Sequence, residues 1–112
     1  MAQKVQIDNL VLELRRGMIV LAVLSQLNEE HYGYSLLKSL SGLGLEIDQG
    51  TLYPLLRRLE SQGLLTSTWK VEESRPRRYY VTSTEGREIL PHLKQEWTNI
   101  VALMDTMLEN VK

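Results

Sequence analysis

Arginine and tyrosine side chains gather between residues 48 and 82 in a pattern suited to binding phosphates rather than to catalysis. Tyr53, Arg57 and Arg58 occur at helical spacing, and three further arginines follow within residues 75–78. Guanidinium groups bind phosphates and guanine edges, and tyrosine hydroxyls donate to phosphate oxygens. These residue types therefore predict recognition of a nucleic-acid backbone and of its base edges.

A helix must present the first of these groups. Read at about 100° per residue, residues 48–65 place their leucines on one narrow stripe, the spacing of a helix docked on a core. The stripe consists of Leu52, Leu55, Leu56 and Leu59. Asp48 can cap the amino end, and Gly63 can end the helix in the left-handed conformation. Such an amphipathic helix can also be an ordinary solvated surface helix, so this stretch alone leaves both interpretations open.

Pro54 lies six positions after Asp48, where proline removes one backbone hydrogen bond and presses on the carbonyl of Gly50. We therefore predict a bent or 3₁₀-like first turn, or a regular helix that starts later than Asp48. That distortion would leave Thr51 and Tyr53 at the exposed tip of the helix.

Residues 64–82 predict a β-hairpin that presents the second group of arginines. Two runs rich in β-branched and aromatic residues flank an arginine-rich tip, residues 73–78, that contains Pro76. Trp69, in the first run, is expected to pack the hairpin onto the helices. A helix followed directly by a basic hairpin is the arrangement of a winged helix-turn-helix, whose helix enters the major groove.

Two further helices are predicted before this unit. Residues 7–27 keep helical spacing at first and are then apolar almost all round, which indicates a long helix with a buried carboxyl half. Residues 28–33 read as a connector, and residues 34–43 as a short helix with three leucines inward. A glycine-bearing turn, residues 42–47, completes a helix-turn-helix pattern.

The last helix is expected to begin at a capping box, Thr82 to Glu85, and to be kinked or restarted at Pro91. Its apolar residues alternate at spacings of three and four, which is a heptad seam. The seam that we assign to dimerisation consists of Leu90, Leu93, Trp97, Ile100, Met104, Met107, Leu108 and Val111. A helix about 40 Å long is too long for so small a domain to cover.

The predicted fold is therefore mainly α with a small β-hairpin, in two parts. Residues 1–82 form a winged helix-turn-helix DNA-binding domain with an amino-terminal helix, and residues 83–112 form a long dimerisation helix. A second copy of the chain is the expected partner of the seam. The alternative is an antiparallel contact with the first helix of the same chain, and the two arrangements can coexist.

Composition narrows the class of protein. The 112 residues suffice for one domain with a modest core, and the net charge of -1 argues against a strong nonspecific nucleic-acid binder. Residues 33–80 nevertheless carry seven bases against five acids, an excess of +2. The chain has no cysteine, no apolar run of about 18 residues and no secretory signal pattern, so we expect a cytoplasmic protein without a membrane segment.

Catalytic and cofactor patterns are missing from the sequence. His31 and His92 are the only histidines and lie in unrelated segments, with no carboxylates spaced as in a triad or metal site. The sequence also has no phosphate-cradling glycine loop. We therefore predict a protein that is not an enzyme and that has no metal and no cofactor.

Three strings resemble the PadR family of transcriptional regulators. They are YGYSL at residues 32–36, GTLYPLLRRLESQGL at 50–64 and RPRRYYVTSTEG at 75–86. The resemblance covers nearly the whole chain from Leu14 onward, and the single final helix is similar to the short subfamily. It implies a homodimeric repressor that binds a palindromic operator in double-stranded DNA and is released by a small effector.

The resemblance also implies which residues act. The DNA-facing set would be Tyr34, Lys38, Gln49, Gly50, Thr51, Tyr53, Pro54, Arg57, Arg75, Arg77 and Arg78. Some short members hold flat aromatic compounds between last-helix tryptophans of the two chains, which points to Trp97. The other effector-binding candidates would be Val11, Leu14, Met18, Ile100 and Met104. For Trp97 itself, a buried core position remains the alternative.

One function of another class also fits the predicted fold. Winged helices also serve as protein-interaction modules that do not bind DNA. The arginines on both helix and hairpin favour the regulator, and a salt-dependent mobility shift would distinguish the two.

Overall fold

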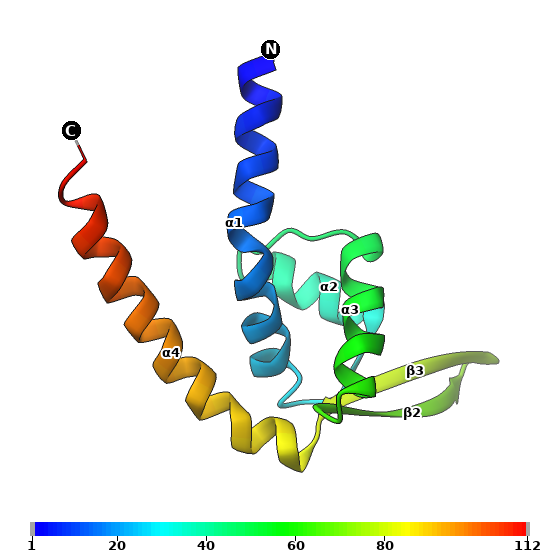
Figure 1. The fold of residues 1–112 in the computed structure, drawn as a ribbon. Coiled ribbons are helices and arrows are strands. Elements are labelled where there is room, and N and C mark those ends of the chain that lie inside the picture. Colours follow the sequence, from blue (N-terminus) through cyan, green and yellow to red (C-terminus); the bar gives the residue numbers. More distant parts are fainter. Residues whose placement is uncertain (1, 112) are drawn as a thin grey trace.

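The computed structural model describes residues 2–111 and has four helices and a small three-stranded sheet, whose β2–β3 hairpin projects from one side of the helices (Figure 1). In chain order the elements are α1 (Ala2–Gln26), β1 (His31–Tyr32), α2 (Gly33–Gly42), α3 (Gln49–Ser61), β2 (Leu65–Glu72), β3 (Arg75–Thr82) and α4 (Thr84–Leu108). This is the predicted winged helix-turn-helix with a long helix at each end. The two long helices diverge from a body made of α2, α3 and the sheet, and the molecule measures 58 × 38 × 23 Å.

Buried side chains from α1, α2, α3, their connecting segments and the two long strands form one core, and all of them but Tyr80 are aliphatic. The buried set is Ile19, Val23, Leu24, Leu27, Leu36, Leu40, Leu45, Leu52, Leu55, Leu56, Leu59, Leu65 and Tyr80. It contains the whole predicted stripe of α3, and from α1 only the carboxyl half. Burial of this stripe fixes the rotation of α3 about its axis, so its opposite side must face outward.

Both ends of α3 confirm the predicted caps. The Asp48 carboxylate accepts a hydrogen bond from the Thr51 backbone N–H at 2.8 Å. At the other end, Gly63 has a φ of 83°, and the backbone N–H of Leu64 donates to the carbonyl of Leu59 at 2.9 Å. This is the Schellman arrangement that glycine permits at low cost.

The predicted distortion at Pro54 is wrong. The α-helix begins at Gln49, directly after the Asp48 cap, and continues through Pro54. Proline removes only the donor that would bond the carbonyl of Gly50, and Gly50 is exposed, so water can satisfy that carbonyl. The cap fixes the first turn independently of this missing bond.

The sheet differs from the predicted hairpin in two ways. The expected connector contains β1, which pairs with β3, so the strand order is β1-β3-β2 and all pairs are antiparallel. The expected six-residue tip is only a two-residue turn, Glu73 and Ser74, with φ of 53° and 64°. A turn with both central residues at positive φ matches the twist of the strands, and it leaves Arg75, Arg77 and Arg78 on β3 rather than in a loop.

The start of α4 lies one residue later than predicted. Ser83 is the cap, and its hydroxyl accepts from the backbone N–H of Gly86 at 3.0 Å. Thr82 is instead buried, and its hydroxyl donates to the carbonyl of Leu24 at 3.0 Å. The helix is not restarted at Pro91, because α4 is continuous from Thr84 to Leu108.

Within residues 2–111, no helix combines the length and apolarity needed to span a bilayer.

The cap of α3 predicts a pH dependence of stability. Hydrogen bonding from Thr51, first from its side chain and then from its backbone N–H, holds the pKa of Asp48 below its usual value of 3.8. A carboxyl whose pKa is lowered on folding stabilises the fold above the unfolded pKa and loses this effect as pH falls through the folded pKa. The wild type should therefore melt at a higher temperature than Asp48→Asn at neutral pH, and the difference should shrink below about pH 3.8. Equal melting temperatures at neutral pH would contradict the role of the charge.

Candidate nucleic-acid interface

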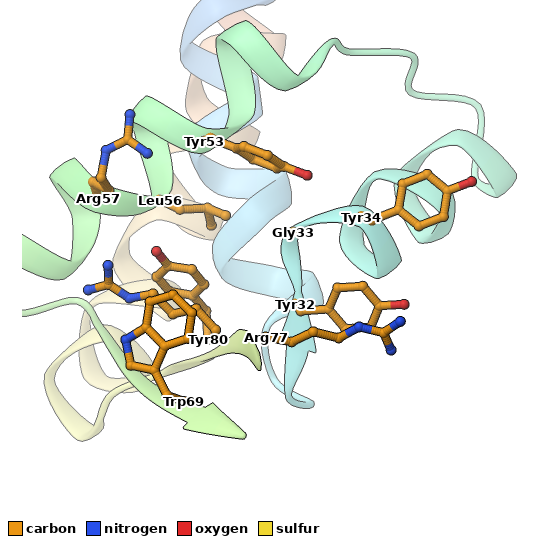
Figure 2. Close-up of a pocket in the computed structure, with 10 residues that line it drawn as sticks. Tyr32, Gly33, Tyr34, Tyr53, Leu56, Arg57, Trp69, Arg77 and Tyr80 are labelled. Carbon is orange, nitrogen blue, oxygen red and sulfur yellow. The ribbon is translucent and has the colours of Figure 1, made fainter. Parts of the chain in front are cut away.

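The outward side of α3 borders a hollow of about 330 Å³, which is also lined by β1, by the start of α2 and by the wing (Figure 2). The wing comprises β2, β3 and their turn. We call this space the wing hollow. Its lining residues are Tyr32, Gly33, Tyr34, Tyr53, Leu56, Arg57, Trp69, Arg77, Arg78 and Tyr80. None of these ten residues is acidic, so the hollow combines cationic and hydroxyl donors with aromatic rings and suits an anionic partner.

The start of α2 is held against α3 by a close contact. The ring of Tyr53 extends from α3 toward Gly33, at which a Cβ would lie only 2.4 Å from Tyr53 Cε1 (Figure 2). Only glycine leaves room for the ring here. The contact brings Tyr34, which is exposed at the first turn of α2, to the same side of the molecule as Tyr53.

The structure gathers five of the eleven predicted DNA-facing residues in the wing hollow: Tyr34, Tyr53, Arg57, Arg77 and Arg78. The other six are exposed around it: Lys38, Gln49, Gly50, Thr51, Pro54 and Arg75. Thr51 and Pro54 line a separate hollow on the α1 side of α3, together with Arg58. The predicted DNA-facing residues therefore lie on two sides of α3 and do not share one hollow.

The arginines differ in how far the chain itself engages them. Arg57 and Arg75 are exposed, and within residues 2–111 no acid lies at ion-pair distance from them. Arg77 lies 3.6 Å from a carboxylate oxygen of Glu72, and its guanidinium stacks 4.5 Å from the centre of the Tyr32 ring.

Arg78 is the most strongly engaged. Its terminal nitrogen pairs with Glu60 at 2.5 Å, and its Nε donates to the Ser67 hydroxyl at 3.0 Å. Its guanidinium is therefore occupied within the chain, whereas those of Arg57 and Arg75 are available to a partner.

The prediction that Trp69 packs the wing onto the helices is wrong. Trp69 points to the same side of the sheet as Tyr80, yet it is 64% exposed, because the hairpin extends beyond the helices that cover its base. The ring lies in the wing hollow near Tyr80 (Figure 2) and 5.9 Å from the Arg78 guanidinium. Sequence reasoning therefore missed an exposed flat apolar surface. Because side chains alternate along a strand, Trp69 lies on the same face of β2 as the buried Leu65. This alternation does not show how far along the strand the helices cover that face.

Lys70 and Tyr79, on the other face of the wing, each have an acidic partner. Lys70 forms an ion pair with Glu30, and the hydrogen bond to Glu30 raises the pKa of Lys70. Tyr79 donates to Glu72 at 2.6 Å, and this hydrogen bond raises the pKa of Tyr79. In the hollow, burial raises the pKa of Tyr80, so its hydroxyl stays protonated at neutral pH.

A groove of about 290 Å³ lies between α1 and α4. It is lined by Leu14, Gly17, Met18, Val20, Leu21, Leu93, Glu96, Trp97 and Ile100. Four of the six predicted effector residues are among these, whereas Val11 and Met104 are not. Trp97 is 43% exposed in the single chain, so it is not a buried core residue there.

The predicted seam on α4 is largely uncovered. Leu90 and Leu93 are half-buried against the core, whereas Trp97, Ile100, Met104, Met107, Leu108 and Val111 are exposed. The amino half of α1 is similar: Val5, Ile7, Leu10, Leu12 and Leu14 are exposed, with Leu14 at 82%. Apolar surface on this scale, on two neighbouring helices, is typical of a protein-protein interface.

Comparison with known proteins identifies the family. The model of the "Transcriptional regulator PadR-like family" matches residues 20–92, which run from the buried half of α1 into α4. The chain belongs to the PadR-like family. It is similar to a PadR family transcriptional regulator from Eggerthella lenta, with 48% identity, a TM-score of 0.91 and 98% of each chain covered.

Two further relatives agree with this assignment. Transcriptional regulator Rv3488 of Mycobacterium tuberculosis is 39% identical over 79 residues, covering 70% of this chain and 74% of the relative. A PadR-like transcriptional regulator from Bacillus cereus has 31% identity and a TM-score of 0.67, covering 88% of this chain and 96% of that chain.

This PadR-like chain is therefore a transcriptional regulator, in a family of DNA-binding and typically dimeric proteins rather than enzymes. Membership disfavours the alternative of a winged-helix protein-interaction module.

Proposed function

We propose that this PadR-like regulator is a homodimeric repressor that binds a palindromic operator through α3 and the wing. The observation that carries the proposal is the wing hollow, which arginines and tyrosines of β1, α2, α3 and β3 line without an acid among the lining residues. An α-helix fits the major groove of B-DNA, and arginines of a wing can follow the adjacent backbone or narrow minor groove.

Within this proposal the contacts divide by chemistry. Arg57 is placed to reach a guanine edge, because it is exposed and free of an acidic partner in the described chain. Tyr34, Lys38, Gln49, Thr51 and Tyr53 would donate to phosphates, while Gly50 and Pro54 allow close approach. Arg75 and Arg77 would contact the backbone on the wing side.

Dimerisation would supply the second half-site. The exposed apolar faces of α1 and α4 support pairing with a second copy, because water-exposed leucines and methionines gain free energy when a partner covers them. A dimer places two copies of α3 on one face of a duplex, and half-sites about 34 Å apart would be read together.

Arg57→Ala and Arg77→Ala test the DNA-binding surface. Each should weaken binding to a duplex from the region upstream of the chain's own gene by about tenfold. Arg77→Ala, which removes the proposed phosphate contact, should also reduce the salt slope by about one. Mobility shifts over a range of salt concentrations measure both. Arg87→Ala, at an exposed position on α4, is the matched control. Absence of any shift by the wild type at low salt would contradict the proposal and favour the protein-interaction module.

The proposed effector is a planar aromatic compound bound in the groove between α1 and α4. Trp97 offers an exposed ring, and Glu96 adds a carboxylate to an otherwise apolar lining, so a flat cation is the favoured class. An effector here would change the tilt of α4 and with it the separation of the two copies of α3, which would release the operator.

The groove is tested with a planar cationic dye in the Trp69→Phe protein, whose only tryptophan is Trp97. Dye binding should quench its fluorescence, because the ring would stack on the dye. In calorimetry, Trp97→Ala should weaken dye binding by about tenfold, while Trp69→Phe alone should leave it unchanged. No quenching at high dye concentration would contradict this site.

A further inference from the structure

Three side chains join the recognition helix to the wing. Arg78 on β3 pairs with Glu60 in the last turn of α3 at 2.5 Å and donates to Ser67 on β2 at 3.0 Å. The Ser67 hydroxyl in turn donates to the other carboxylate oxygen of Glu60. This closed ring, which we call the wing clamp, spans α3 and both long strands.

Glu60 is an unexpected residue at this position. A carboxylate in the last turn of a helix opposes the helix dipole, and an acid on a DNA-facing helix repels phosphates. Arg57, three residues before Glu60, is close enough along the helix to form an ion pair with it. Among the described residues, however, Glu60 forms its ion pair with Arg78. The clamp therefore compensates the acid and leaves Arg57 free.

Arg78 is held on more than one side. Its guanidinium lies 5.3 Å from the centre of the Tyr80 ring and 5.9 Å from that of Trp69. The Arg78 side chain is 35% exposed and that of Glu60 is 25% exposed, so water screens the pair less than a fully exposed ion pair. A phosphate contact by Arg78 would have to compete with Glu60 for the same guanidinium.

We infer that Glu60, Ser67 and Arg78 are positioning residues that set the angle of the wing to α3, and that Arg78 does not bind phosphate directly. The inference rests on the proposed operator binding. Arg75 lies three residues beyond Arg78 along the strand, about 10 Å away, so a small change of angle at the clamp moves the wing arginine by ångströms. The clamp would thereby keep Arg57 and Arg75 in register with one stretch of duplex.

The sign of a charge deletion tests this inference. Glu60→Ala removes a negative charge beside the DNA, and by electrostatics alone this loss should strengthen DNA binding. If the wing clamp positions the wing, the same substitution should instead weaken DNA binding by about fivefold. Arg78→Ala should have a similar effect without changing the salt slope, and the double variant should be no weaker than either single one. Glu29→Ala, which removes an exposed acid before β1, is the matched control and should not weaken binding.

The probe is a duplex selected from a random pool by the wild-type protein, and thermal melting reports whether each variant is folded. If Glu60→Ala binds as tightly as wild type, or if Arg78→Ala lowers the salt slope by about one, the inference is overturned and Arg78 is a phosphate contact. If Glu60→Ala unfolds, Glu60→Gln keeps the shape without the charge and should still weaken binding. Failure of the wild type to select any duplex would overturn operator binding itself, a result distinct from loss in a variant.

Discussion

Replacing Gly86 with alanine is expected to destabilise the protein by roughly 3 kcal/mol and to lower its melting temperature by about 10 °C. An added Cβ would lie 2.3 Å from the carbonyl oxygen of Leu64 and 2.6 Å from Cγ2 of Thr82. Neither atom can move freely, because the Leu64 carbonyl accepts from the Ser83 backbone N–H at 3.0 Å and Thr82 is buried.

Gly86 lies beside the junction between β3 and α4, residues 82–83, which is hydrogen-bonded to the segments that follow α1 and α3. The Thr82 backbone N–H donates to the carbonyl of Leu27 at 2.8 Å, and the Ser83 hydroxyl donates to that of Gly63 at 2.6 Å. Gly42→Ala is the matched control, since nothing lies within 4 Å of a Cβ there, and it should not destabilise. Thermal melting that finds Gly86→Ala as stable as the control would contradict the tight junction.

The double substitution Ile100→Glu and Met104→Glu is expected to convert the proposed dimer to a monomer and to reduce affinity for the proposed operator by at least about a hundredfold. Each glutamate would place a charge at the centre of the seam, where a partner would have to bury it unpaired. Loss of the dimer removes the simultaneous contact with two half-sites, which contributes most of the affinity of a symmetric binder. Sedimentation and mobility shifts measure the two effects.

A control variant separates the seam from added charge in general. Gln95→Glu and Thr106→Glu introduce the same two charges on exposed positions of the opposite side of α4. This variant should remain dimeric and bind DNA nearly as the wild type does. A seam variant that stays dimeric would show that the apolar face of α4 does not hold the two copies together.

Local patterns predicted the elements well where a single mechanism controls them. The leucine stripe of α3, its Asp48 cap and its Gly63 stop are all confirmed, because burial, an N-terminal acceptor and a positive φ each depend on a few neighbouring residues. The error at Pro54 arose from treating one lost hydrogen bond as decisive when the carbonyl concerned can reach water. Thr82 was wrongly predicted to cap α4. Its hydroxyl is instead buried and donates to the carbonyl of Leu24, and a threonine before a helix can take either role with the same local sequence.

Contacts between distant segments could not be predicted from sequence in the same way. Strand β1 has only two residues and exists because it pairs with β3 nearly fifty positions later, which no local pattern encodes. Trp69 was expected to pack against the helices, but its exposure depends on how far the helices extend over the sheet. The engagement of Arg78 by Glu60 likewise depends on the angle between α3 and the wing.

The sequence by itself determined the kind of molecule: a leucine-backed helix with an arginine-bearing outer side, a basic hairpin and an apolar final helix, assembled as in PadR-like regulators. Periodicity carries this information because burial selects residues at fixed helical and strand intervals. Only the tertiary structure decided which arginines are free, that Trp69 is exposed, and that the α1–α4 groove excludes Val11 and Met104. These outcomes depend on distances between segments far apart in the chain, which packing sets and local spacing does not.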